Sequence, residues 1–193
     1  MPRSGRRRTG RSDPFVPLEH IFPRPTRKGI RASPALFGGS SWPPPAYSPR
    51  TRLLYVLGSY FPMRFTVDSV YAARGGGDPF THAYFRKLPD SLQYGVLSAV
   101  DVNTGHIRWQ RRIGRHLMYG GALATESGLV FFGDSQGWLN ALDAETGETL
   151  WRGRGGHGAL GPPISYVVDG RQRIAVTSQR GLTVFGLPEP RGP

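Results

Sequence analysis

A repeat of 42 residues constrains the fold of this chain more than any other feature. The stretch AVDVNTGHIRW at 99–109 recurs as ALDAETGETLW at 141–151, with Ala, Asp, Thr, Gly and Trp at matching positions. A four-stranded β-propeller blade takes about 40–45 residues and cannot bury both of its faces without neighbouring blades. Two copies therefore predict a ring of blades, or part of one.

Each copy of the repeat predicts a strand, a tight turn and a second strand. Gly105 and Gly147 supply the positive φ that such turns often need, and the Asp of each copy can accept hydrogen bonds from backbone amides across the turn. Trp109 and Trp151 follow these glycines by four residues. We expect both tryptophans to pack between blades, and we expect structural roles for all of these residues.

The chain from Ser33 onward alternates short β-type runs with Gly, Pro and Asp, which is typical of an all-β fold. The runs predict a partial β-propeller of two full four-stranded blades plus three strands of a third, within 33–187. Residues 66–93 are rich in Gly and Pro and are interpreted as an insertion loop. The predicted strands lie near residue 46 and at 53–58, 96–101, 106–111, 120–125, 128–133, 138–143, 148–153, 163–168, 172–177 and 182–187.

Length and targeting signals set further bounds. Eight blades would need on the order of 350 residues, whereas this chain has 193, so we expect only part of such a ring. No apolar run is long enough to predict a transmembrane helix. The start MPRSGRRRTGRSDPF has no apolar stretch after its charges and does not fit a signal peptide. The absence of cysteine excludes disulfides and thiolate metal sites.

The net charge of +12 is concentrated at the N-terminal end, where residues 1–31 contain nine Lys or Arg against two acidic residues. Residues 1–32 therefore read as a basic, Pro- and Arg-rich disordered tail, and 188–193 as a disordered C-terminus. A basic arm can bind nucleic acid or acidic lipid headgroups. Without the interleaved aromatic residues of a nucleic-acid module, the composition favours a solvated tail or a misassigned start codon.

Two longer runs resemble one known family. YGGALATESGLVFFGDSQGWLNALDAETGETLWRGRGGHGALGPPISYVVDGRQRIAV at 119–176 and GGSSWPPPAYSPRTRLLYV at 38–56 are similar to the C-terminal blades of pyrroloquinoline quinone (PQQ) dependent alcohol and glucose dehydrogenases, the quinoproteins. The resemblance implies an eight-bladed propeller that holds PQQ with a calcium or lanthanide ion. It also implies periplasmic oxidation of alcohols or sugars, with an electron acceptor such as a cytochrome or a quinone.

The same resemblance places the metal ligands, the catalytic Asp and the vicinal cysteines of the family in earlier blades. We therefore expect no catalytic and no metal-binding residues here, and a chain that is the C-terminal part of such an enzyme. It would be inactive until the N-terminal blades, on a separate chain, complete the ring.

The resemblance also carries two cofactor contacts to this sequence, both altered. An Asn that reaches the cofactor falls at Ser59, where a shorter side chain keeps a hydrogen-bonding group. The aromatic residue that stacks under the PQQ ring, usually Trp, falls at Tyr119, which still offers a flat π face; a structural role between strands is the alternative there. A third contact, a Trp beyond Val176, has no counterpart.

Other residues give no pattern of a site. The five histidines lack metal-site spacing, and the acidic residues of the insertion fit solvated loop carboxylates. They are His20, His82, His106, His116 and His157, and Asp68, Asp78 and Asp90.

Two functions remain open. One is a C-terminal or split part of a PQQ-dependent dehydrogenase that oxidises alcohols or sugars. The other is a propeller remnant without catalytic activity, or a protein-interaction module. In both, we expect no nucleic-acid partner and an isolated chain prone to self-association through open strand edges.

Overall fold

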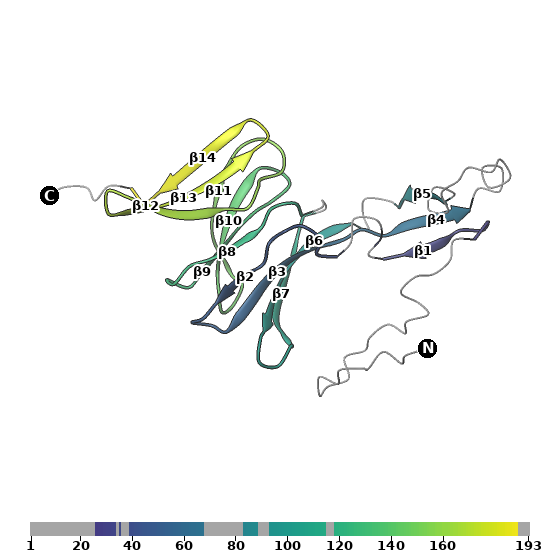
Figure 1. Cartoon of the computed structure of the whole chain (residues 1–193), viewed down its shortest axis with the longest axis horizontal. Helices are drawn as coiled ribbons and strands as arrows, with labels where there is room; N and C mark the ends of the chain where they lie inside the picture. The colour runs from purple at the N-terminus through teal and green to yellow at the C-terminus, as the bar shows by residue number, and fades with distance from the viewer. Residues whose placement is uncertain are drawn as a thin grey trace, which may run out of the picture. The chain divides into compact units, whose positions relative to one another are not determined.

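A computed structural model describes residues 26–33, 35, 39–67, 83–88, 93–114 and 118–188. Within these ranges the structure is all-β, with strands β1 to β14 and no helix (Figure 1). The chain divides into two compact units, one formed by 1–32 and 64–86 and the other by 33–63 and 87–193. The second unit contains the sheets that the repeat predicts.

The first blade is the four-stranded antiparallel sheet β2-β3-β6-β7. Its strands are β2 (Ala46–Ser48), β3 (Leu53–Tyr60), β6 (Tyr94–Asp101) and β7 (Ile107–Ile113). Burial alternates along β6, because successive side chains of a strand point to opposite faces. The predicted strands of this blade are therefore found, and β3 and β7 each extend two residues further than predicted.

The second blade is the sheet β8-β9-β10-β11, also antiparallel. Its strands are β8 (Ala122–Ala124), β9 (Leu129–Gly133), β10 (Trp138–Asp143) and β11 (Thr149–Arg154). A register irregularity separates Ala141 from Leu142, and the matching irregularity in the first blade separates Ala99 from Val100. The repeat thus reproduces even the local distortion of the ladder.

The third sheet, which we call the third blade, has the order β12-β13-β14. Its strands are β12 (Ile164–Val168), β13 (Arg171–Ser178) and β14 (Gly181–Gly186). Three strands at these positions are what the sequence predicts.

The turns of the repeat have the predicted chemistry. Asp143 Oδ1 accepts hydrogen bonds from the amides of Glu145 and Thr146 at 3.0 and 2.8 Å, and Asp101 Oδ1 accepts the equivalent pair at 2.9 and 3.2 Å. Gly105 and Gly147 have φ of 73° and 69°. A side-chain acceptor and a glycine in the left-handed region together close each turn.

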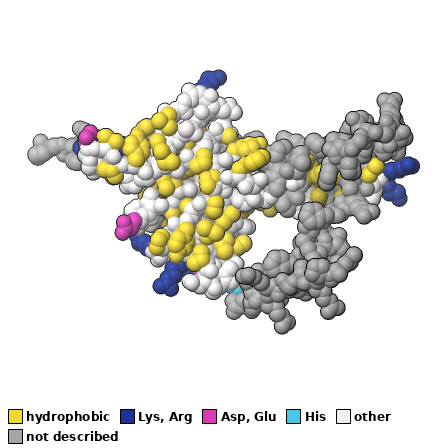
Figure 2. Space-filling model, in the orientation of Figure 1, with side chains coloured by type: hydrophobic (Ala, Val, Ile, Leu, Met, Phe, Trp, Pro, Cys, Tyr) yellow, Lys and Arg dark blue, Asp and Glu magenta, His cyan; other side chains and the backbone are white. Residues whose placement is uncertain are grey.

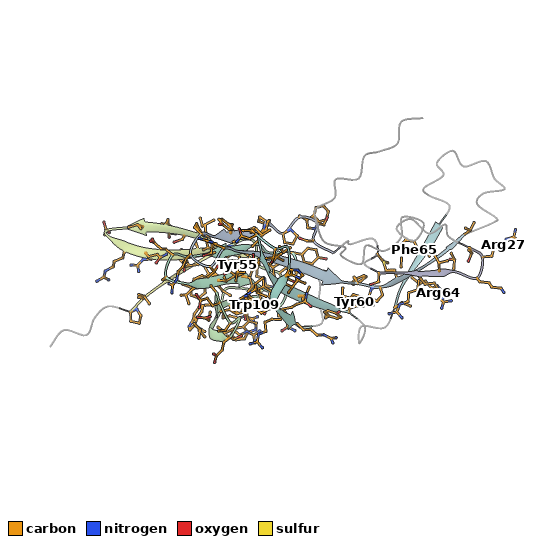
Figure 3. The ribbon with its side chains drawn as sticks, turned by 90° about the horizontal axis from the view of Figure 1, so that it is seen from below. Arg27, Tyr55, Tyr60, Arg64, Phe65 and Trp109 are labelled. Carbon is orange, nitrogen blue, oxygen red and sulfur yellow. The ribbon has the colours of Figure 1, made fainter. Side chains whose placement is uncertain are left out.

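Trp109 joins the first blade to the second, as predicted. Its Nε1–H donates to the carbonyl oxygen of Ala144 at 3.1 Å, and the buried Tyr55 donates its hydroxyl to the same oxygen at 3.0 Å. The two rings lie 5.9 Å apart (Figure 3). Around them, apolar side chains of both blades form one core: Leu53, Leu57, Leu97, Ala99, Met118, Val130, Phe132, Leu142 and Ala144.

Trp151 makes the corresponding contact with the third blade. Its ring meets that of Phe185 edge to face, with centroids 5.3 Å apart. Leu139, Leu160, Ile174 and Val176 form a second, smaller core between these blades. Trp151 keeps 43% of its surface exposed, so this contact is less complete than that of Trp109.

The other unit contains a small sheet that sequence analysis did not predict. It has the order β1-β4-β5, formed by β1 (Ile30–Ala32), β4 (Met63–Val67) and β5 (Ala83–Lys87). A parallel bridge joins Thr26 to Thr66, and the Arg64 guanidinium donates to the carbonyl oxygen of Lys28 at 3.3 Å. Figure 3 marks Arg27, Arg64 and Phe65 of this unit.

The small sheet corrects two boundaries. Residues 30–32 were assigned to a disordered tail, and 66–93 to an insertion loop, yet β1 lies in the first range and most of β4 and β5 in or beside the second. Each of these strands has only three to five residues, which is too short for a period of two to stand out from Gly- and Pro-rich surroundings. Residues 1–25, 68–82, 89–92 and 189–193 lie outside the described ranges.

Candidate functional site

The two residues predicted from the resemblance lie around one small cavity. Ser59 is near the end of β3, and Tyr119 precedes β8 by three residues. Together with Gly39, Ser41, Trp42, Pro43 and Met118 they line a cavity of about 10 Å³. The fold therefore brings together two side chains that are 60 residues apart in sequence.

Ser59 already uses its hydroxyl in the fold. The side chain is 7% exposed, and its Oγ accepts a hydrogen bond from the amide of Met118 at 2.9 Å. The Ser59 amide in turn donates to the carbonyl oxygen of Gly39 at 2.6 Å. Ser59 thus ties the loop before β2 and the loop before β8 to the end of β3, and its geometry suits a positioning role.

Two aromatic side chains stand at the mouth of this cavity. Tyr119 is 46% exposed and Trp42 is 74% exposed. Exposed aromatic rings of this size offer flat surfaces for stacking a planar ligand. Sequence reasoning missed Trp42, although its place in the Gly- and Pro-rich loop GGSSWPPP, outside any repeat, is a usable signal.

A cavity of about 10 Å³ has room for about one water molecule. The described residues therefore form one wall of a site and do not enclose a cofactor. Ser59 and the two rings would offer a flat, mostly apolar surface, which suits a planar polycyclic group better than a metal ion or a phosphate.

The remaining candidates stay apart from this wall. His106 and His157 are exposed on separate turns. Among the described residues, no group of three His, Cys, Asp or Glu could hold a metal ion, and no helix is long and apolar enough to cross a membrane. Beyond the described ranges lie His20, His82, His116, Asp68, Asp78 and Asp90.

Two groups with shifted pKa values belong to the blade framework. Burial raises the pKa of the Tyr55 hydroxyl. Hydrogen bonds from the amide and the hydroxyl of Thr146 lower the pKa of Asp143. Both residues lie at the contact between the first and second blades, and neither lines the cavity beside Ser59. Their shifts reflect structural hydrogen bonding.

Comparison with known proteins gives one matching family model. The model describes the β-propeller domain of PQQ-dependent glucose, ethanol and alcohol dehydrogenases and matches residues 91–174. The matched range includes Tyr119 and both copies of the repeat.

Individual relatives agree with this match. Quinoprotein alcohol dehydrogenase PedE of Pseudomonas putida is 34% identical over 177 residues, which cover 87% of this chain and 28% of the relative. The lanthanide-dependent methanol dehydrogenase of Methylacidiphilum fumariolicum is 32% identical over 166 residues, or 81% of this chain and 26% of the relative.

A solved structure shows the same fold. The quinohemoprotein alcohol dehydrogenase ADHIIG of Pseudomonas putida HK5 superposes with a TM-score of 0.67 at 25% identity, over 79% of this chain and 24% of that one. The chain therefore spans between a quarter and a third of the length of the relatives that it matches.

Proposed function

We propose, from the premise that this chain is a β-propeller segment of the PQQ-dependent dehydrogenase type, that it forms part of the cofactor wall of an alcohol-oxidising enzyme. The observation that carries this proposal is the placement of Ser59, Trp42 and Tyr119 around one cavity. In the proposed enzyme the chain binds and orients PQQ. The catalytic base and the metal site belong to other blades.

Each residue has its own part in this proposal. Trp42 and Tyr119 stack against the planar cofactor and exclude water from one of its faces. Ser59 holds the backbone before Tyr119 through the amide of Met118. When bound, the quinone accepts the two electrons that leave the alcohol, so the hard chemistry is the cofactor's. Calcium or a lanthanide ion would polarise the quinone from residues elsewhere in the ring.

The proposed partners follow from the same reasoning. The remaining blades would cover the chain from a second polypeptide or from a longer one, and a cytochrome or a quinone would accept the electrons. We place the complete assembly in the periplasm, as the resemblance implies. Alcohols and sugars are the proposed substrate class.

The proposal is tested by titrating the purified full chain with PQQ in the presence of calcium and following heat release by calorimetry. We expect saturable binding that Trp42→Ala and Tyr119→Ala each weaken about two- to tenfold, the range for loss of one aromatic stacking contact. Tyr47→Ala serves as the matched control, because Tyr47 is 49% exposed on β2 and does not line the cavity.

Absence of binding at high micromolar PQQ, or equal weakening by Tyr47→Ala, would contradict a cofactor wall made by these residues. Either result would favour the alternative function, a propeller module that acts through protein contacts. The apolar side chains exposed on the third blade, Ile164, Val184 and Leu182 among them, are the feature that favours this alternative.

A further inference from the structure

A second and much larger cavity lies between the first and second blades. It has a volume of about 600 Å³ and shares only Met118 with the small cavity beside Ser59. Cavities that bind small organic molecules commonly measure about 300–1,000 Å³. The described residues therefore hold a ligand-sized space outside the proposed cofactor wall.

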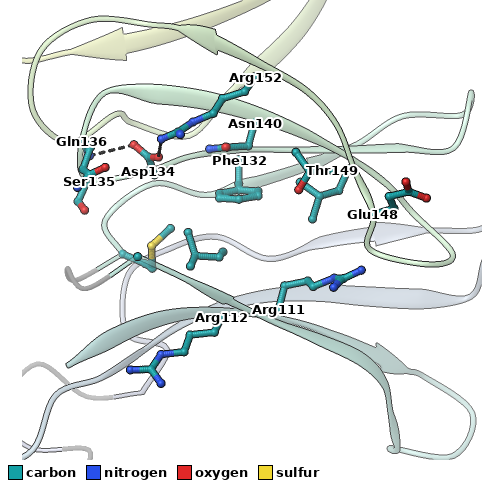
Figure 4. A pocket seen from close by; sticks show the side chains of 14 residues that line it. Arg111, Arg112, Phe132, Asp134, Ser135, Gln136, Asn140, Glu148, Thr149 and Arg152 are labelled. Atoms are coloured by element: carbon teal, nitrogen blue, oxygen red, sulfur yellow. Dashed lines mark hydrogen bonds and ion pairs between the residues drawn. The ribbon is translucent and has the colours of Figure 1, made fainter. Parts of the chain in front are cut away.

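One wall of this cavity is a row of three side chains across the second blade. Phe132 on β9, Asn140 on β10 and Arg152 on β11 are direct neighbours in the sheet register. Phe132 is 3% exposed and packs in the core shared with the first blade. The row therefore presents an aromatic ring, an amide and a guanidinium on the face that meets the first blade (Figure 4).

The polar members of the row are held in place. Arg152 pairs with the nearly buried Asp134 at 3.1 Å and lies 4.3 Å from the centre of the Trp138 ring. Asn140 is 8% exposed, and its amide nitrogen donates one hydrogen bond, to the carbonyl oxygen of Trp138 at 3.2 Å. One further N–H of Asn140 is left for a ligand.

The opposite wall is strand β7 of the first blade, which contributes Arg111 (Figure 4). The Arg111 Nε–H donates to the carbonyl oxygen of Gly147 at 2.9 Å, which fixes the base of the guanidinium. Its terminal N–H groups have no bond of their own among the described residues. Arg111 and Arg152 thus approach the same cavity from different blades.

The charges and surfaces of the cavity define the ligand class. Three arginines and two carboxylates line it, and one of the carboxylates, Asp134, is already paired. Apolar side chains line the interior: Ile113, Met118, Phe132 and Leu142. A guanidinium binds a carboxylate through two parallel hydrogen bonds, and an inorganic ion alone would leave most of this volume empty.

We propose that the inter-blade cavity binds a small organic carboxylate with an apolar body. The carboxylate lies between Arg111 and Arg152, and the apolar body packs on Phe132 and Met118. The site requires no PQQ and no further blade, so it stands or falls independently of the proposed function.

The test uses 1-naphthoate as the probe, titrated into the full chain and followed by calorimetry. We expect saturable binding that Arg111→Gln and Arg152→Gln each weaken at least about tenfold, because hydrogen bonds to charged groups are lost. Arg154→Gln is the matched control. Arg154 lies on the same strand, also stacks on Trp138 at 5.1 Å, and does not line the cavity, so we expect less than a twofold effect.

The comparison ligands decide the chemistry. Neutral 1-naphthalenemethanol should bind at least about tenfold more weakly than 1-naphthoate, and inorganic phosphate should not compete at equal concentration. Equal binding of the neutral alcohol would overturn the carboxylate assignment, and competition by phosphate would overturn the apolar one. Equal loss in Arg154→Gln would show a general charge effect. Arg111→Gln leaves the Asp134 pair intact, so it reports on the cavity even if Arg152→Gln lowers stability.

Discussion

Gly105 and Gly147 occupy equivalent positions of the repeat but have different surroundings. An added Cβ at Gly105 would meet nothing within 4 Å, whereas one at Gly147 would lie 2.7 Å from the ring of Trp109. Both residues have positive φ, so both pay the cost of placing an L side chain in the left-handed region, about 1 kcal/mol.

We therefore predict that Gly105→Ala lowers the free energy of unfolding by about 1 kcal/mol. Gly147→Ala should cost about 1–3 kcal/mol more, the usual range for overpacking. Urea unfolding of the two variants beside the wild type measures the difference. Equal costs would mean that Trp109 does not pack on the turn of the second blade in solution.

Asp143 makes the stability of the same turn depend on pH. Its pKa is lowered first by the Thr146 amide and then by the Thr146 hydroxyl, which donates to Asp143 Oδ1 at 2.9 Å. A carboxyl whose pKa is lower in the folded state stabilises the fold above the unfolded pKa, about 3.9. That contribution is lost as pH falls from there through the folded pKa.

We predict that Thr146→Val lowers the melting temperature at neutral pH, and that this deficit shrinks as the pH falls below about 4. Thr104→Val is the matched control. Thr104 and Thr146 each accept a hydrogen bond from an amide two residues further on, but only the Thr146 hydroxyl donates to an Asp. The Thr104→Val deficit should stay constant, and a parallel change in both variants would contradict the assignment to Asp143. Melting curves from pH 7 to pH 3 provide the comparison.

At the scale of strands, the sequence predicted the elements whose signals are local and repeated. The strands of the second blade were expected within a residue or two of their observed ends, because Asp134, Asp143, Gly137 and Gly147 mark their turns. A turn that closes by an Asp side chain and a left-handed Gly depends on a few adjacent residues. Such features can be predicted without knowing the rest of the fold.

The strands that escaped prediction depend on partners distant in sequence. β1 pairs with β4, more than 30 residues away, and neither strand is long enough to show a pattern. The cavity around Ser59 and Tyr119 was foreseen through resemblance alone. The use of the Ser59 hydroxyl by Met118, and the presence of Trp42 beside Tyr119, follow from how loops of different blades meet, which no local signal carries.

At the scale of the whole molecule, the blades differ in how completely their faces are covered. Tyr55 and Leu97 of the first blade are fully buried under the second. In the third blade, Ile174 and Phe185 pack towards the second, and the neighbouring residues of the same strands point to the other face. There, Ile164 and Val184 flank the buried Ala175 and are 57% and 47% exposed. Figure 2 shows hydrophobic side chains gathered over these strands.

Exposed apolar side chains beside an open strand edge favour association between molecules. We predict that the isolated chain self-associates with increasing concentration, and that the double variant Ile164→Lys, Val184→Lys reduces this association, since charges oppose burial of the face. Val102→Lys adds a charge at a residue that is 48% exposed in a turn of the first blade, away from the third sheet, and should leave association unchanged. Size-exclusion chromatography with light scattering over a hundredfold concentration range measures this directly. A wild-type chain that stays monomeric throughout would mean that part of the chain itself covers this face, and the third blade would then need no partner.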